Sequence, residues 1–123
     1  MKLKQQLRKG STETLILTLL SEQPMYGYQI AQEMATRSEG YFEMKEGLLY
    51  PALHQMEQDG LVCGEWRPGQ GERRRKYYLI TDKGRRVLAD SVVEWQDFAA
   101  RLLGLIGADG AKPGLAPGLG GTR

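Results

Sequence analysis

Apolar positions at helical spacing predict two helices in the first third of the chain. Apolar residues recur one turn apart between Leu15 and Leu20, after Ser11, a residue type that favours the N-cap of a helix. Pro24 ends this first helix, because proline has no backbone donor for a helical hydrogen bond. A second helix is predicted over about residues 27–37.

The next apolar pattern predicts a third helix from residue 47 or 48 to Gly60, which is a suitable C-cap. Pro51 is expected at the edge of its first turn, where a missing backbone N–H is least harmful. Before this helix, residues 41–44 are predicted to form a very short strand.

Two β-favouring runs follow the third helix. They span residues 61–66 and 76–80, and a turn signal, Pro-Gly-Gln-Gly, lies between them at residues 68–71. We therefore expect a hairpin with an arginine-rich tip. Thr81 then resembles the N-cap of a long last helix that extends to about Ile106.

The order of these elements predicts the fold class. Helix, helix, short strand, helix, hairpin and long helix is the order of a winged helix-turn-helix with a β-hairpin wing, in a mainly α (α+β) protein. We expect a winged helix DNA-binding domain over residues 1–82 and a C-terminal dimerisation helix over residues 83–106. Residues 107–123 are rich in Gly and Pro, so we expect a disordered tail there.

Composition narrows the class of protein. The 123 residues are 41% hydrophobic, which is enough for one compact domain, and no apolar run approaches the length that crosses a bilayer. Cys63 is the single cysteine, and with His54 it is too little for a zinc site, so we expect no disulfide, metal or cofactor. No signal peptide is recognisable, so we expect a cytoplasmic protein without a membrane partner.

Basic residues are concentrated in two segments, although the net charge is only +2. Residues 1–10 hold four basic residues and no acidic one, and residues 65–86 hold eight basic residues against three acidic ones. Solvated surface charge is the plain interpretation of such runs. Two of them on a near-neutral chain also indicate an anion-binding surface.

The third helix has two different faces. Leu49, Leu53 and Met56 form an apolar stripe that predicts the side packed on the core. The opposite face is polar but uncharged, and glutamines on such a face can pair with adenine edges in a major groove. Because this face has no Arg or Lys, we expect sparse base readout and an affinity that comes largely from phosphate contacts elsewhere.

Cations around this helix complete the predicted DNA-binding surface. The wing arginines are positioned to grip a phosphate backbone or reach a minor groove, and the N-terminal segment can present a lysine and a helix N-terminus to phosphate. Tyr28 can donate its hydroxyl to phosphate, and a half-buried aromatic is the alternative interpretation. The candidate DNA-binding residues are Lys9, Ser11, Tyr28, Gly47, Tyr50, Pro51, His54, Gln55, Gln58, Arg73, Arg74, Arg75 and Lys76.

Three motifs in the same order carry a family resemblance. Residues 17–30 read LTLLSEQPMYGYQI, residues 46–61 read EGLLYPALHQMEQDGL, and residues 73–81 read RRRKYYLIT, with a glycine at position 84. Together they resemble the PadR family of bacterial transcriptional regulators over about residues 8–106. The length of the last region resembles the short, acidobacterial-type members with a single C-terminal dimerisation helix. The resemblance implies that Tyr50 and Pro51 start the recognition helix near the DNA.

The last helix carries a heptad seam. Its members recur at spacings of four and three residues, and apolar neighbours widen the stripe beyond what one small domain covers. We therefore expect this helix to form a dimer rather than pack within one chain. The predicted interface residues are Leu88, Val92, Trp95, Ala99, Leu102 and Ile106.

Trp95, in the middle of this seam, has two interpretations. A tryptophan there can stack on a small planar aromatic effector between the subunits, as the resemblance to ligand-responsive PadR proteins suggests. It can also simply fill the interface, which is the commoner role of a large aromatic. Trp66 is expected to pack within the wing.

The predicted function is a homodimeric, sequence-specific regulator of transcription that binds double-stranded DNA. Two-fold symmetry predicts recognition helices about 34 Å apart on an inverted repeat, and binding near a promoter predicts a repressor. Two alternatives stay open: an architectural DNA-binding protein with little sequence preference, and a ligand- or protein-interaction module without DNA binding. We expect no enzyme, because His54 lacks a nucleophile or paired carboxylate in a catalytic arrangement.

Overall fold

The computed structural model describes residues 2–69, 71 and 73–107, with the backbone alone at residues 2–6, 8 and 9. The described elements are α1 (Lys2–Leu20), β1 (Met25–Tyr26), α2 (Gly27–Arg37), α3 (Glu46–Gln58), β2 (Val62–Pro68), β3 (Arg74–Ile80) and α4 (Asp82–Ile106). The chain divides into two compact units between Ala89 and Asp90, and α4 belongs to both. We call the first unit the head. The tail predicted beyond residue 107 lies outside the described residues.

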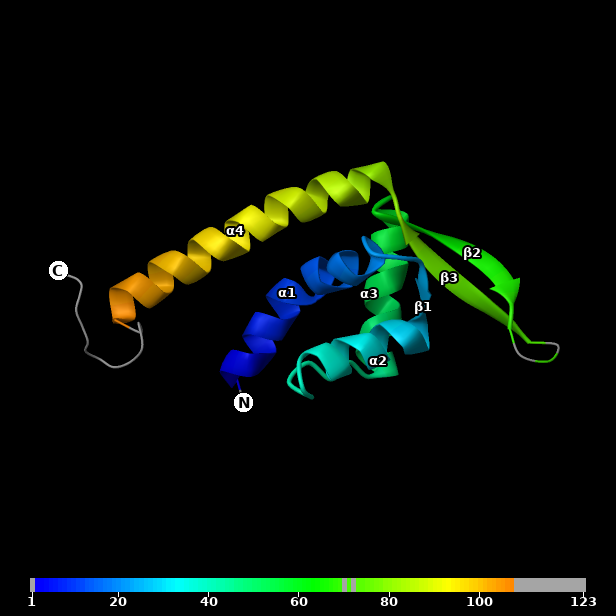
Figure 1. Cartoon of the computed structure of the whole chain (residues 1–123), viewed down its shortest axis with the longest axis horizontal. Helices are drawn as coiled ribbons and strands as arrows, with labels where there is room; N and C mark the ends of the chain where they lie inside the picture. The colour runs from blue at the N-terminus through cyan, green and yellow to red at the C-terminus, as the bar shows by residue number, and fades with distance from the viewer. Residues whose placement is uncertain (1, 70, 72, 108–123) are drawn as a thin grey trace. The chain divides into compact units, whose positions relative to one another are not determined.

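The head has the predicted winged helix-turn-helix order, with α1, α2 and α3 grouped together and the β2–β3 hairpin extending from them as a wing (Figure 1). Ile16 of α1, Ile30 of α2 and Leu53 of α3 are fully buried where the helices meet. Leu49 and Met56 are buried beside Leu53, so the apolar stripe predicted on the third helix is confirmed. Burial of these large side chains is the main favourable contribution to folding.

The sheet is antiparallel, with the strand order β1-β3-β2. β2 pairs with β3 from Val62 opposite Ile80 to Pro68 opposite Arg74, so the hairpin extends further than the sequence predicted. β1 pairs only with Tyr77 and Tyr78 of β3. The sequence analysis missed β1, because two residues are too few to show an alternating pattern.

Two local predictions for the first half of the chain are wrong. α1 begins at Lys2, so Ser11 is inside the helix and is not its N-cap, and its hydroxyl donates to the carbonyl of Leu7 (2.8 Å). A serine inside a helix commonly donates its hydroxyl hydrogen bond to the backbone carbonyl one turn earlier. The strand predicted at residues 41–44 is also absent, because this described segment folds back on the end of α2, where the N–H of Phe42 donates to the Ser38 hydroxyl (2.8 Å).

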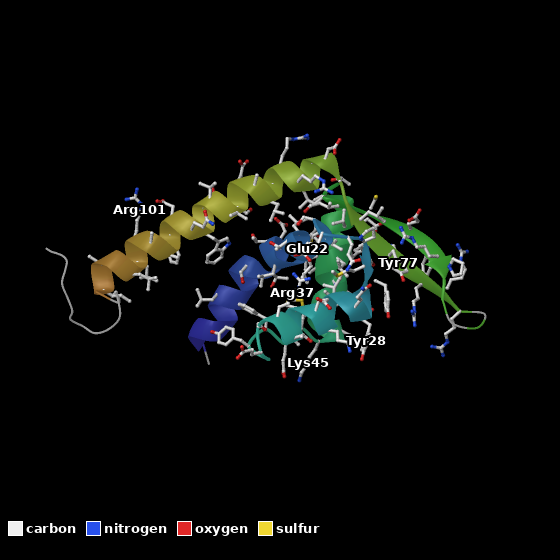
Figure 2. The ribbon with its side chains drawn as sticks, viewed as in Figure 1. Glu22, Tyr28, Arg37, Lys45, Tyr77 and Arg101 are labelled. Atoms are coloured by element: carbon white, nitrogen blue, oxygen red, sulfur yellow. The ribbon has the colours of Figure 1, made fainter. Side chains whose placement is uncertain are left out.

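An ion-pair network holds the loop after α1 against the end of α2. Arg37 donates through both terminal nitrogens to the carboxylate of Glu22, at 2.6 and 2.7 Å, and through Nε to Glu33 at 3.0 Å (Figure 2). The guanidinium holds the pKa of Glu22 below its ordinary value. Because all three side chains are well exposed to solvent, the network contributes little to the free energy of unfolding.

The ends of α3 are close to those predicted. The helix begins at Glu46, so Pro51 lies inside it rather than at the edge of its first turn. It closes at Gly60, where φ is +79° and the N–H of Leu61 donates to the carbonyl of Met56 (2.9 Å). A glycine suits this position, because other residues rarely adopt a left-handed backbone.

Thr81 joins the end of α3 to the start of α4. Its hydroxyl donates to the carbonyl of Gly60 (2.6 Å) and accepts from the N–H of Gly84 (3.0 Å), which confirms the predicted N-cap. Gly84 is buried, and a Cβ there would collide with the carbonyl of Leu61. The first turn of α4 is therefore held closely against the segment that connects α3 to β2.

Candidate nucleic-acid interface

α3 presents an uncharged polar face to solvent. The five residues predicted on this face are all exposed, whereas the opposite side of the helix is buried in the core; the five are Gly47, Pro51, His54, Gln55 and Gln58. The side chain of Gln55 donates through Nε2 to Asp59 Oδ1 at 3.0 Å. A contact between this amide group and a base edge would therefore exchange that hydrogen bond for a new one.

Tyr50 lies between this face and α2. Its side chain is 41% exposed, and its ring lies against Gly27, the first residue of α2. A Cβ at position 27 would lie only 2.6–2.7 Å from two carbon atoms of the ring, which is far inside van der Waals contact. The missing side chain of Gly27 therefore allows the Tyr50 ring to pack against the start of α2.

Tyr28 is the second residue of α2, and Lys45 directly precedes α3. Tyr28 is 64% exposed, so the interpretation of this residue as a half-buried aromatic is wrong. Lys45 is the exposed N-cap residue of α3, and both side chains project from the lower edge of the head in Figure 2. The sequence analysis missed Lys45, although a lysine directly before the predicted recognition helix was a usable signal.

The basic residues of the wing do not form one continuous surface. Of the four that were predicted to bind DNA, Arg74, Arg75 and Lys76 lie within β3 rather than at the hairpin tip, and Arg73 precedes the strand. In the register with β2, Lys76 is opposite Trp66 and Arg75 is opposite Arg67. Successive side chains of a strand alternate between its faces, so Lys76 and Arg75 point to opposite faces of the wing.

Lys76 is paired with a carboxylate on α3. Its Nζ donates to Oε1 of Glu57 on α3 at 2.9 Å, and the two side chains are 30% and 33% exposed. This hydrogen bond raises the pKa of Lys76 above its ordinary value. Lys76 therefore ties the wing to α3, and its charge is already compensated before any anion binds.

Aromatic rings hold the two remaining arginines of β3. The guanidinium of Arg75 lies 4.4 Å from the ring centroid of Tyr26, and that of Arg74 lies 6.0 Å from the ring centroid of Trp66. Such cation–π contacts orient a guanidinium without neutralising it. Trp66 contacts Arg74 within the wing, as predicted, but its side chain is 56% exposed, so this packing covers only part of the ring.

The N-terminal candidates are placed on α1. The side chain of Lys9 lies outside the described residues. Ser11 is in the helix interior, so no helix N-terminus is available there to bind phosphate, which removes the physical reason for that prediction.

The seam residues predicted on α4 divide between the two units. Leu88 packs against the core of the head. Val92 and Trp95 are partly exposed in the second unit, and Trp95 meets Phe98 edge to face at 5.9 Å. Ala99 is exposed. The large apolar side chains exposed toward the end of the helix are Phe98, Leu102, Leu103, Leu105 and Ile106.

The three helices of the head, the exposed polar face of α3 and the basic wing define the winged helix-turn-helix class of protein. Residues 16–90 match the transcriptional regulator PadR-like family. The chain belongs to this family and is a transcriptional regulator of the PadR type. Regulators of this family bind DNA, and its members are typically dimers. Along the described chain, no helix is both long and apolar enough to cross a membrane.

Solved structures of family members share the fold. The PadR family transcriptional regulator from Eggerthella lenta is 30% identical, with a TM-score of 0.76, over 88% of this chain and 92% of that one. The PadR-like transcriptional regulator from Bacillus cereus is also 30% identical, with a TM-score of 0.74, over 85% of this chain and 99% of that one. The transcriptional regulator Rv3488 from Mycobacterium tuberculosis is 28% identical over 99 residues, which are 80% of this chain and 89% of that protein.

Proposed function

We propose that this regulator is a homodimeric repressor that binds an inverted-repeat operator through α3 and the wing. The observation that carries the proposal is the exposed, uncharged face of α3 beside a wing whose Arg74 and Arg75 form no ion pair with a carboxylate among the described residues. An uncharged polar helix face suits the edges of bases in a major groove, and arginines suit the phosphates that border it.

The two-fold arrangement is supported by the apolar surface at the end of α4. Phe98, Leu102 and Ile106 are 51%, 43% and 62% exposed, and a second copy of the chain is the partner for which family membership argues. A two-fold dimer presents its recognition helices to successive major grooves, roughly 34 Å apart. A dimer bound in this way across a promoter blocks access of the polymerase, which makes the protein a repressor.

A small planar aromatic effector is part of the same proposal. Trp95 is partly exposed and adjoins Phe98, so a flat ligand could stack between copies of the helix. The competing role of Trp95, as filler of the dimer interface, predicts no change in tryptophan fluorescence when aromatic compounds are added.

A low-specificity architectural protein is the second candidate function. The absence of Arg and Lys from the exposed face of α3 favours it, because the common bidentate contact to guanine is then missing. Such a protein would bind all duplexes with similar affinity and strong salt dependence.

The test is a titration into duplex DNA from the region upstream of its own coding sequence, beside a scrambled duplex, at about 150 mM salt. We expect a preference for the native duplex of roughly a thousandfold, which is the lower end for specific regulators. If the preference is small, duplexes selected from a random pool separate a distant operator from an architectural role. A protein that binds neither native, scrambled nor selected duplexes would contradict the proposal and support the interaction module.

A further inference from the structure

A hollow of about 330 Å³ opens where the wing meets the helix-turn-helix. Tyr26 and Gly27 line it where β1 leads into α2, and Tyr50 lines it from α3. The wing contributes the remaining lining residues, which are Trp66, Arg74, Arg75, Lys76 and Tyr78. Arg74 and Lys76 reach this hollow from one face of the wing and Arg75 from the other, around the edge of β3, so aromatic rings and cations surround one concave site beside α3.

The hollow exists because β1 is short. β1 pairs with Tyr77 and Tyr78 alone, so residues 74–76 of β3 have no neighbouring strand on that side in the described part of the chain. An uncovered strand edge presents backbone donors and acceptors beside its side chains. The ring of Tyr50, which packs against Gly27, bounds the opposite side.

Two of the three cations in the hollow are available to an anion. Lys76 is hydrogen bonded to Glu57 at 2.9 Å. Arg74 and Arg75 contact aromatic rings, and no carboxylate among the described residues forms an ion pair with either. A guanidinium that lies over a ring keeps its N–H edge, which is the edge that binds phosphate oxygens.

We propose that this hollow seats one nucleotide unit of a bound DNA strand, with its phosphate at Arg74 and Arg75 and its sugar against Trp66 and Tyr50. The inference rests on the proposed function and assigns one of its phosphate contacts to a particular site. The volume lies at the lower end of the range for small-molecule sites, roughly 300–1,000 Å³, which suits a single phosphate with its sugar. Because α3 itself offers no cation on its exposed face, a phosphate site directly beside it holds the helix in register.

The first experiment compares single-site variants on a duplex that the unchanged protein binds. Arg74→Ala and Arg75→Ala are each expected to weaken binding about tenfold, and to reduce the dependence of log affinity on log salt by about two, because the homodimer loses one cation from each of its two half-sites. Arg86→Ala is the matched control, since it removes the same charge from an exposed position on α4 that does not line the hollow. We expect it to change affinity less than about twofold, because surface charges at a distance are screened by salt.

Variants of Trp66 distinguish binding of a nucleotide in the hollow from simple attraction between charges. Trp66→Ala is expected to weaken binding about fivefold or more with an unchanged salt dependence, because it removes a ring contact and no charge. Trp66→Phe keeps a ring and is expected to restore most of the affinity. Circular dichroism and the melting temperature of each variant establish that the head remains folded.

Neutral methylphosphonates, placed one at a time along the same duplex, locate the contact. For the unchanged protein, we expect one position in each half-site at which the neutral group weakens binding about tenfold. In the double variant Arg74→Ala/Arg75→Ala, that position is expected to lose its effect, because the phosphate then has neither arginine as a partner.

The outcomes distinguish this inference from the function on which it rests. If the unchanged protein binds its selected duplex but Arg74→Ala and Arg75→Ala match Arg86→Ala, the hollow is not the phosphate site and the regulator remains. A methylphosphonate effect that persists in the double variant Arg74→Ala/Arg75→Ala assigns the phosphate to another residue and overturns the inference. If the unchanged protein binds no duplex, the proposed function itself fails.

Discussion

At the scale of single residues, two glycines determine how closely the elements of the head approach one another. Gly27 accommodates the ring of Tyr50, and Gly84 accommodates the carbonyl of Leu61. In both places the space for a methyl group is already occupied. These positions are therefore constrained by packing, and Gly84 is the more stringent because its neighbour is a backbone carbonyl that cannot rotate away.

Replacing Gly84 by alanine is expected to lower the free energy of unfolding by about 1–3 kcal/mol, because a Cβ forces the first turn of α4 away from Leu61. The matched control is Gly104→Ala in the same helix, where a Cβ would meet nothing within 4 Å. Alanine there should stabilise the helix by about 0.5–1 kcal/mol. Urea unfolding measures both variants, and equal stability of the two would contradict the close packing at Gly84.

At the scale of elements, the wing and α3 are coupled by an ion pair. Glu57 is on α3 and Lys76 is on β3, and their hydrogen bond of 2.9 Å joins the two elements that we propose contact DNA. Position 64 of β2 lies beside this pair, where a side chain larger than glycine would displace the Lys76 stem. The orientation of the wing relative to α3 therefore depends on a polar contact as well as on the core.

A double-mutant cycle with Glu57→Gln and Lys76→Met is expected to give a coupling energy of about 0.5–1 kcal/mol near neutral pH, because both groups are partly solvated. The pKa of Lys76 is raised in the folded state, so the coupling is complete below its ordinary value of 10.5 and is lost as the pH rises through the folded value. Unfolding free energies measured between pH 7 and pH 11 test this. A coupling that does not fall at alkaline pH would show that the pair is not ionic.

At the scale of the whole molecule, the apolar end of α4 is the surface that still requires a partner. Five large apolar side chains are exposed between Phe98 and Ile106, whereas Leu88 is already used by the core of the head. The predicted seam is therefore not uniform: its first member stabilises the head, and its last members are accessible to a second copy. Contiguous apolar surface of this kind marks an interaction site.

Leu102→Asp is expected to convert a dimer into a monomer, because it places an unpaired charge in the proposed seam. Val93→Asp is the matched control, since Val93 is apolar and 64% exposed on the same helix but lies outside the heptad positions. Size-exclusion chromatography with light scattering gives the mass of each variant. A dimeric Leu102→Asp protein would place the interface elsewhere, and an unchanged protein that is monomeric would remove the dimer from the proposed function.

The accuracy of the sequence predictions follows the range of the interactions that determine each feature. The second and third helices, the hairpin, the Thr81 cap and the Gly60 closure were predicted, since their signals lie within a few residues. The prediction of an N-cap at Ser11 was wrong although its signal was also local. A serine suits an N-cap, and it equally donates its hydroxyl to a helical carbonyl one turn earlier. Only the chain before Ser11 distinguishes the two, and it carries few apolar residues.

The sequence by itself determined the winged helix-turn-helix order, the family and the uncharged face of α3, because periodicity and motifs are written in neighbouring residues. Only the tertiary structure decided which cations an anion can reach. Glu57 and Lys76 are 19 positions apart in the sequence, which hides their pairing, and the two-residue strand β1 leaves open the edge of β3 at which the hollow forms. Such features arise when distant segments meet, and no local pattern reports the distance between them.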